Sequence, residues 1–280
     1  MKNEIKTIVI DQTKIQFRDF GQGEPVLMLH GNPGTNDDFK NLLEPFGRHG
    51  FRCIVPDRPG HGGTNPFPEA FKDFSKKIEF YGKLMEETCG SPFSLIGYSL
   101  GCFLSLWISL QFPKKVKNLV LLAPFVFKKD QGESPSSIPQ IANLPIIGSF
   151  IRFSLPLLAS KKIQQHIQNV FSPSKLSEKE IEEYLKWMVS PNCLLATIAD
   201  KNDFLSFSAE LEGKLSDIEI QVLSIAGKND LVCDATETVN RLGEKIKSFK
   251  NVFLENAGHS IPLTHGERIS EIVQDHFRTK

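Results

Sequence analysis

Short apolar runs recur along this 280-residue chain, separated by stretches rich in polar and charged residues. Near the N-terminus two such runs, residues 5–10 and 15–20, flank an Asp-Gln-Thr-Lys turn and are predicted to pair as a hairpin. The next run, Pro25 to His30, is almost wholly apolar and stops at Gly31, as expected of a parallel strand covered by helices on both faces. Comparable runs predict further strands at residues 52–56, 93–96, 116–123, 220–226 and 251–254.

Helical periodicity fills the intervals between these runs. In one interval, apolar side chains spaced three and four residues apart form a single stripe: Phe71, Phe74, Ile78, Tyr81 and Met85. Alternation of strands and helices predicts an α/β fold, with a mostly parallel eight-stranded sheet flanked by helices.

The alternation stops at about residue 125 and resumes at about residue 215. Prolines, apolar helical stretches and a charged run at 177–183 replace the strand signals there. We therefore expect residues 1–124 and 215–280 to form the core, and residues 125–214 to form a helical cap inserted between two strands. A cap in that position lies above the carboxyl ends of the strands, where open α/β sheets bind ligands.

Charge and composition exclude several classes of function. Lys plus Arg and Asp plus Glu both number 33, so the formal net charge is zero and a nucleic-acid partner is not expected. The N-terminus lacks the apolar stretch of a signal peptide, and the five cysteines show no C-x-x-C spacing. We expect a reduced, cytoplasmic protein with no metal and no cofactor.

The sequence Gly97-Tyr98-Ser99-Leu100-Gly101 matches the pattern G-x-S-x-G. It follows the predicted strand at 93–96 and precedes an apolar helical run that reaches Phe112. A serine on a sharp strand-to-helix turn needs small neighbours at both glycine positions, and the turn exposes its hydroxyl. This context indicates a nucleophile rather than an ordinary glycine-rich turn.

Four further motifs accompany this one and give the chain a resemblance to the α/β-hydrolase superfamily. They are His30-Gly31-Asn32-Pro33-Gly34, Asp57-Arg58-Pro59-Gly60-His61-Gly62, Gly227-Lys228-Asn229-Asp230 and Gly258-His259. The resemblance covers nearly the whole chain outside the insertion, and is to the capped branch that contains serine esterases, epoxide hydrolases and haloalkane dehalogenases. The order Ser99, Asp230, His259 is the order of nucleophile, acid and base in these hydrolases.

The resemblance assigns a role to each of these three residues. Ser99 is the expected nucleophile, His259 the base that takes its proton, and Asp230 the acid that orients the imidazole. Among the other histidines, His30 and His61 are interpreted as structural residues of glycine-rich motifs, with His30 buried. The remaining four have no motif around them and are expected to be solvated: His49, His166, His265 and His276.

Two backbone N–H groups are expected to bind the oxyanion. One belongs to Leu100, the residue after the nucleophile, and the other, by resemblance, to Asn32. Dehalogenases and epoxide hydrolases use a carboxylate nucleophile, so Ser99 argues against both chemistries. The Asn32 side chain either holds its loop or orients a substrate.

An apolar underside of the cap is expected to line a substrate pocket. Candidate lining residues are Phe125, Phe127, Phe150, Phe153 and Trp187. The resulting hypothesis is a serine hydrolase of small esters with an apolar acyl or alcohol arm, with weak lipid contact through residues 143–159. Lactonase, carbon–carbon bond hydrolase and perhydrolase activities use the same triad and stay open, as does a non-catalytic ligand receptor on the same fold.

Overall fold

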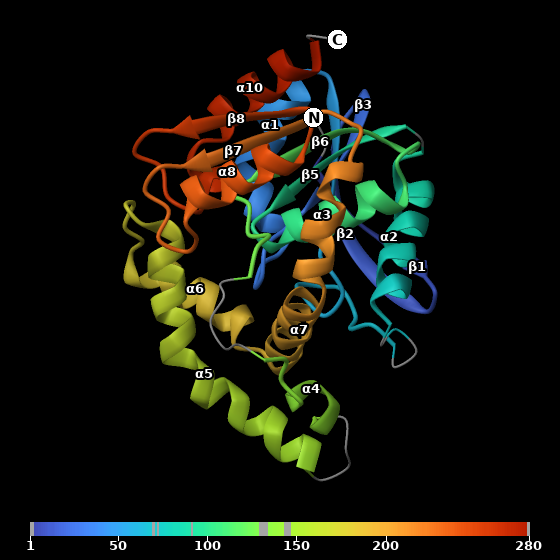
Figure 1. Ribbon diagram of the computed structural model, residues 1–280. Coiled ribbons are helices and arrows are strands. Elements are labelled where there is room, and N and C mark those ends of the chain that lie inside the picture. Colours follow the sequence, from blue (N-terminus) through green and yellow to red (C-terminus); the bar gives the residue numbers. More distant parts are fainter. Residues whose placement is uncertain are drawn as a thin grey trace.

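The computed structural model of the protein describes residues 3–68, 71, 73–90, 92–128, 134–142 and 147–278. Strands and helices alternate along the chain and build a central sheet with helices on both faces (Figure 1). The strands are β1 (Asn3–Ile10), β2 (Thr13–Gly21), β3 (Glu24–Leu29), β4 (Phe51–Pro56), β5 (Phe93–Tyr98), β6 (Val116–Leu122), β7 (Val222–Gly227) and β8 (Phe249–Leu254). The helices of the core are α1 (Lys40–Arg48), α2 (Phe74–Thr88), α3 (Leu100–Gln111), α8 (Ala235–Lys245), α9 (Ile261–Thr264) and α10 (Gly266–Arg278), with short 3₁₀ turns η1 (Asn36–Phe39) and η3 (Leu215–Asp217).

The eight strands lie in the order β1-β2-β4-β3-β5-β6-β7-β8. The first two form an antiparallel hairpin, β2 pairs antiparallel with β4, and every other neighbouring pair is parallel. The predicted eight-stranded, mostly parallel sheet is therefore confirmed. Helix α2 begins at Phe74 rather than at Phe71, because the Asp73 side chain accepts the N–H of Ser75 and caps the helix there.

Residues of each central strand alternate between two apolar cores. In β3, Leu27 and Leu29 pack with residues of α2 and α3 on one face, whereas Val26 and Met28 pack with residues of α1 and α10 on the other. All four are fully buried. Burial on both faces explains why these strands appear in the sequence as continuous apolar runs.

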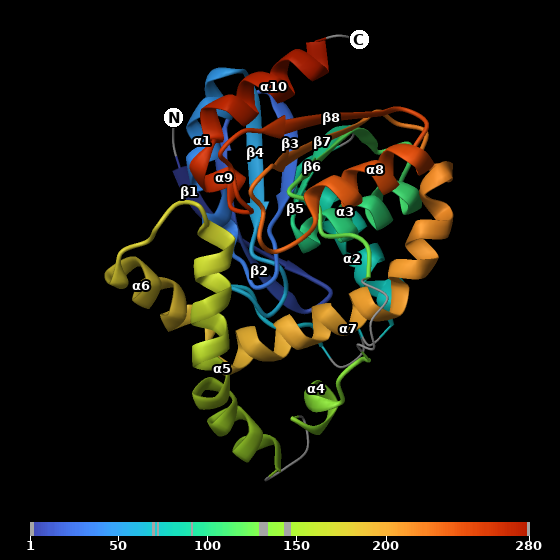
Figure 2. The same cartoon turned by 60° about the vertical axis from the view of Figure 1, so that its left-hand side comes forward.

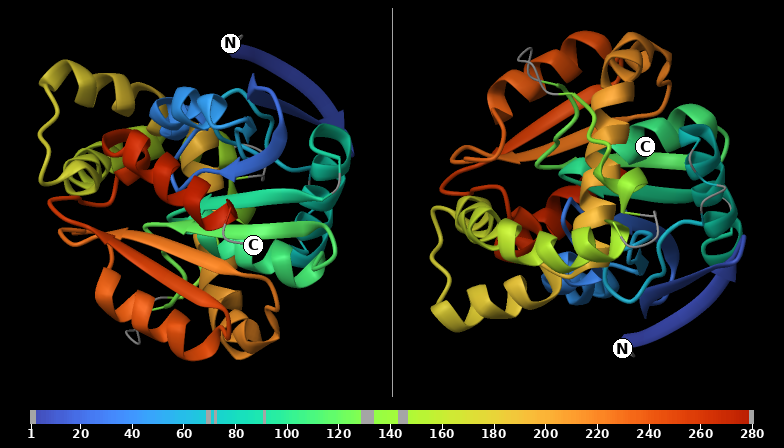
Figure 3. Two further views of the ribbon diagram at one scale, coloured as in Figure 1. Left: turned by 90° about the horizontal axis from the view of Figure 1, so that it is seen from above. Right: turned by 90° about the horizontal axis from the view of Figure 1, so that it is seen from below.

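In the part of the chain that the structure describes, four α-helices lie between β6 and β7: α4 (Ile138–Ile141), α5 (Ile147–Phe171), α6 (Glu178–Met188) and α7 (Pro191–Lys214). We call them the cap helices and keep 125–214 as the predicted bounds of the cap. They lie at one end of the sheet (Figures 2 and 3). Helices α5, α6 and α7 share an apolar cluster: Ile163, Ile167, Phe171, Ile181, Met188 and Leu194. Helix α6 begins with a capping box, in which the Ser177 hydroxyl accepts the Glu180 N–H and the Glu180 carboxylate accepts the Ser177 N–H.

The segment 143–159, expected to contact lipid, falls partly outside the described residues, which begin again at Ile147. Its described part carries several large, exposed apolar side chains: Ile147, Phe150, Phe153, Leu157 and Leu158. None of the helices formed by the described residues combines the length and the apolar character needed to cross a bilayer.

Candidate active site

Ser99 occupies a sharp turn between β5 and α3. Its backbone φ is 53° and its ψ is −121°, a left-handed conformation that costs a residue with a side chain about 1–3 kcal/mol. Two glycines make the turn possible: a Cβ on Gly97 would lie 2.6 Å from the Gly101 carbonyl oxygen, and a Cβ on Gly101 would overlap the Leu29 carbonyl oxygen. The turn holds the Ser99 hydroxyl beyond the end of the strand.

His259 lies between Ser99 and Asp230. Its Nε2 is 2.8 Å from Ser99 Oγ, and its Nδ1 is 2.6 Å from Asp230 Oδ2. Because an ionised carboxylate can only accept, Nδ1–H donates to Asp230 and Nε2 accepts the Ser99 hydroxyl. The His259 and Asp230 side chains are 2% and 0% exposed, so the hydrogen bond between them is shielded from bulk water. The three residues named from the sequence are thus brought together.

Several donors converge on the Asp230 carboxylate. Burial alone would raise its pKa, but the hydrogen bond and charge of His259 act in the opposite direction. The N–H groups of Val232 and Cys233 donate to Asp230 Oδ1 at 2.7 and 3.1 Å. Their combined effect holds the pKa of Asp230 below its ordinary value, so the carboxylate is ionised at neutral pH.

The topology explains how residues so far apart in sequence meet. Ser99, Asp230 and His259 follow the parallel strands β5, β7 and β8, whose carboxyl ends share one edge of the sheet. The loops after β7 and β8 are tied together by the Asn229 N–H, which donates to the Ala257 carbonyl at 2.8 Å.

The loop after β3 runs beside the Ser99 turn. A Cβ added to Gly31 would lie 3.1 Å from Ser99 Cβ, and both Asn32 and Ser99 line the same small cavity. Leu100 is the first residue of α3, where backbone N–H groups have no intrahelical acceptor. The Asn32 Nδ2 donates to the Thr197 carbonyl of α7 at 2.9 Å, which favours a loop-holding role for this amide.

A cavity of about 30 Å³ adjoins Ser99. Part of its wall is apolar and comes from the cap helices and α9: Ile167, Val170, Phe171, Met188 and Leu263. The polar part comprises Asn32, Asp38, Tyr98, His166 and Tyr184, together with Ser99 and His259. Described residues that line it include no Lys and no Arg.

Three polar residues of this cavity were not identified from the sequence. His166 of α5 was expected to be solvated, which is wrong: burial and the nearby His259 lower its pKa to about 4. Asp38 is only 7% exposed, and burial raises its pKa to about 8. Tyr184 comes from α6. The one sequence signal was the stripe His166, Ile167, Val170 and Phe171, whose spacing places these residues on one face of α5.

The five aromatic residues proposed from the sequence do not line this cavity. Phe125 packs on Phe204, with ring centroids 4.9 Å apart, and Phe127 lies under the Arg241 guanidinium. Phe150 and Phe153 are 71% and 75% exposed on α5, and Trp187 packs on the apolar cluster of the cap helices. Irregular spacing of these aromatics could not reveal which of them face the sheet.

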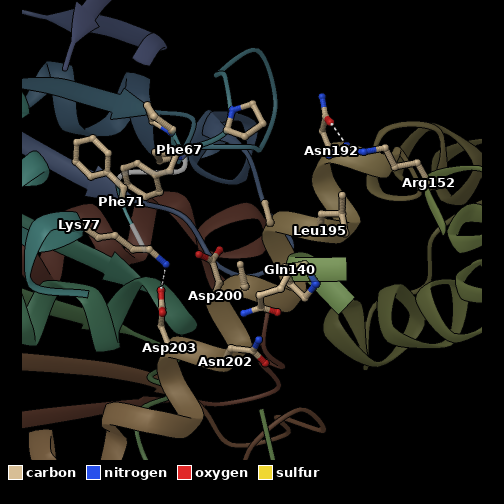
Figure 4. A pocket seen from close by; sticks show the side chains of 16 residues that line it. Phe67, Phe71, Lys77, Gln140, Arg152, Asn192, Leu195, Asp200, Asn202 and Asp203 are labelled. Atoms are coloured by element: carbon tan, nitrogen blue, oxygen red, sulfur yellow. Dashed lines mark hydrogen bonds and ion pairs between the residues drawn. The ribbon is translucent and has the colours of Figure 1, made fainter. Parts of the chain in front are cut away.

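A second cavity, of about 280 Å³, lies away from Ser99 between the loop after β4, α2 and the cap helices (Figure 4). Phe67 and Phe71 stack on one side of it, and Asp200 and Asp203 of α7 line another. Lys77 pairs with Asp203 in the wall of this cavity.

Cys233 adds a thiol next to Asp230 and His259, and these three are the described residues that come close enough together to suggest a metal site. The Cys233 Sγ donates to Asp230 Oδ2 at 3.3 Å, and burial raises the pKa of the thiol. A protonated thiol is a poor metal ligand, and the other two residues are engaged with each other and with Ser99.

Comparison with known proteins identifies the fold family. Residues 24–266 match the family model described as alpha/beta hydrolase fold. The chain is 24% identical over 272 residues to a 2-hydroxy-6-oxononadienedioate/2-hydroxy-6-oxononatrienedioate hydrolase of Escherichia coli, covering 93% of this chain and 89% of the relative. It is 23% identical to the (E)-2-((N-methylformamido)methylene)succinate hydrolase of Acinetobacter baylyi, with 98% of each chain covered.

Among solved structures, epoxide hydrolase CorEH superimposes with a TM-score of 0.78 at 19% identity, covering 99% of both chains, a likeness of fold. The family match spans most of the chain, and the structure has the mostly parallel eight-stranded sheet that the sequence predicted. The protein therefore belongs to the alpha/beta hydrolase fold family.

Proposed function

We propose that this protein is a serine hydrolase that cleaves carboxylic esters with an apolar acyl or alcohol arm. The observation that carries the proposal is the hydrogen-bonded chain Ser99–His259–Asp230, at 2.8 and 2.6 Å, opening onto a cavity with an apolar wall.

In the acylation step, the Ser99 oxygen attacks the ester carbonyl carbon while His259 Nε2 takes the hydroxyl proton. Asp230, already ionised, stabilises the imidazolium that forms. The carbonyl oxygen becomes an oxyanion that accepts from the N–H groups of Leu100 and Asn32. Collapse of the tetrahedral intermediate breaks the bond to the alcohol oxygen, which receives the proton from His259.

Deacylation repeats these steps with water as the nucleophile. His259 takes a proton from the water molecule as its oxygen attacks the acyl-enzyme, and returns that proton to Ser99 Oγ when the acid leaves. No cofactor is needed for either half of the reaction.

Chemistry of the cavity lining bears on the substrate. The two curated relatives act, by their names, on dicarboxylates. Carbon–carbon bond hydrolysis, which uses the same triad, is therefore the second candidate function. Burying a carboxylate without a paired cation is costly, and the described lining of this cavity includes neither Lys nor Arg. This difference supports an uncharged ester over a dicarboxylate.

Covalent labelling tests the proposal. A fluorophosphonate probe should modify Ser99, as read by mass spectrometry of the digested protein, and Ser99→Ala should abolish labelling while the folded protein persists. A wild-type protein that is folded yet unlabelled would instead support a non-catalytic ligand receptor.

A matched set of esters tests the substrate class. Ethyl butyrate should be cleaved with a higher kcat/KM than monoethyl succinate, which places a carboxylate where the first has a methyl group. Among p-nitrophenyl esters, lengthening the acyl chain from acetate should raise kcat/KM. Preference for the succinate ester would overturn the choice of an uncharged substrate.

A further inference from the structure

The peptide group between Gly31 and Asn32 carries hydrogen bonds at both ends. Its N–H is the oxyanion donor proposed above, and its carbonyl oxygen, on Gly31, accepts from Arg58 Nη2 at 2.6 Å and from His30 Nδ1 at 2.9 Å. Because a peptide group is planar, fixing the carbonyl also fixes the direction of the N–H. Donors on the carbonyl further polarise the peptide, which makes its N–H a stronger donor.

His30 is one of the two donors to the Gly31 carbonyl oxygen. Its ring is fully buried, and burial together with the Arg58 charge keeps its pKa well below the ordinary value, so the ring is neutral. The Arg58 backbone N–H donates to His30 Nε2 at 2.8 Å. The ring proton therefore resides on Nδ1 and is donated to the Gly31 carbonyl.

Arg58 brings a full positive charge to the peptide. Its side chain is 1% exposed, and its Nη1 donates to Asp200 Oδ2 at 2.8 Å. Burial would raise the pKa of Asp200, but attraction to Arg58 and the hydrogen bond from His61 outweigh it and bring the pKa to about 2. Both members of the pair are charged at neutral pH.

Asp200 belongs to the cap, not to the core that carries the triad. It lies on α7, which also supplies the Thr197 carbonyl that accepts from the Asn32 side chain. Figure 4 shows Asp200 on this helix beside the large cavity, one turn before Asp203. Helix α7 thus acts on the Gly31–Asn32 peptide through Arg58, and it contacts the Asn32 side chain directly.

We propose that Arg58 and Asp200 are positioning residues of the oxyanion site: Asp200 of the cap orients Arg58, whose guanidinium orients and polarises the Gly31–Asn32 peptide toward the developing oxyanion. The inference rests on the proposed serine hydrolase function. A charge-assisted hydrogen bond in a site of low dielectric constant is strong, and it acts here without touching the substrate.

The main test is Asp200→Asn, which keeps the shape and removes the charge. Loss of a whole oxyanion donor lowers kcat by about 10²–10³ in other hydrolases, so weakening one should lower it by about tenfold, with KM for p-nitrophenyl butyrate changed less than about twofold. Asp203→Asn is the matched control, because it removes a carboxylate of the same helix that pairs with Lys77 and not with Arg58. That control should retain wild-type kinetics.

A boronic acid separates positioning from folding. Its boron accepts the Ser99 oxygen, the hydroxyl proton passes to His259, and a B–OH group of the tetrahedral anion occupies the oxyanion position. The inhibition constant should rise in Asp200→Asn by the same factor as kcat/KM falls. Partial unfolding lowers the concentration of active enzyme but leaves the inhibition constant of the folded fraction unchanged.

A double variant keeps the test decisive if Asp200→Asn does not fold. Arg58→Met with Asp200→Leu replaces the buried pair by apolar side chains, an exchange that is often neutral or stabilising. The proposal expects a folded protein with a weak boronate site and low kcat. Wild-type kinetics in a folded Asp200→Asn or double variant, with Ser99 still labelled, overturn this inference alone. A wild-type protein that neither labels nor binds the boronate overturns the proposed function and this inference with it.

Discussion

Replacing Asp38 by Asn should stabilise the protein, by an amount that grows with pH. The Asp38 side chain lies beside the Ser99 cavity and is 7% exposed, and burial raises its pKa from the ordinary 3.8 to about 8. Between these two values the unfolded chain releases a proton that the folded chain keeps. Wild-type stability therefore falls as pH rises through this window, and an uncharged Asn removes that dependence.

The magnitude follows from the pKa difference. Each pKa unit corresponds to about 1.4 kcal/mol, so at pH 7 the carboxyl group costs the folded state roughly 4 kcal/mol, against roughly 2 kcal/mol at pH 5. Urea unfolding of wild type and Asp38→Asn at pH 5, 6, 7 and 8, followed by circular dichroism, measures both values. The gain should rise over this series and level off above about pH 8.

Asp37→Asn is the control, because it removes the same charge from the neighbouring residue, whose side chain is 64% exposed and pairs with Arg18 at the surface. Its effect should be within about 1 kcal/mol at every pH. If Asp38→Asn shows a gain that does not change with pH, or is destabilising at pH 7, the reasoning from burial is refuted.

Other substitutions test other parts of the structure. Asp230→Asn should lower kcat for p-nitrophenyl butyrate by about 10³–10⁴, because an amide does not hold the imidazole in the required tautomer, while the melting temperature changes little. Burial holds the pKa of His166 at about 4, so wild type loses stability as pH falls from 6.5, and His166→Gln should remove about 2.5 kcal/mol of that loss in urea unfolding at pH 4.5. Gly101→Ala should destabilise by more than about 2 kcal/mol, because its methyl group meets the carbonyl of strand β3, and a lower melting temperature would register it. Leu157→Ser with Leu158→Ser should reduce co-sedimentation with phosphatidylcholine vesicles several-fold and leave hydrolysis of a soluble ester unchanged, since both side chains are exposed on α5.

Local patterns were sufficient to predict the sheet and the residues at its edge. Strands such as β3 are continuous apolar runs because both faces are buried, and a run of only six residues is enough to show this pattern. Ser99, Asp230 and His259 each sit in a short motif directly after a strand. Parallel strands bring such positions to one edge without further information.

Long-range packing determines what the sequence did not reveal. Asp38 lies in an Asn-Asp-Asp turn that looks solvated, yet the turn folds inward beside Ser99. His166 belongs to a 25-residue helix with apolar residues on more than one face, so only its contacts with the core show which face meets the site. Likewise, the link from Arg58 to Asp200 spans 142 residues and has no local signature.

The small size of the cavity beside Ser99 has a consequence for affinity. Its volume of about 30 Å³ is enough for about two water molecules and far too small for an ester. The C-terminal end of α5 is tied to the loop of His259, since the Ser260 N–H donates to the Val170 carbonyl at 3.0 Å and Gly258 lies against the Ser172 carbonyl. An ester can therefore bind beside Ser99 only in a conformation in which this cavity is larger. An open form populated at about one per cent would raise the apparent dissociation constant about 100-fold over that of the open site. Apparent affinities of substrates and inhibitors will accordingly report the opening equilibrium together with the contacts made inside.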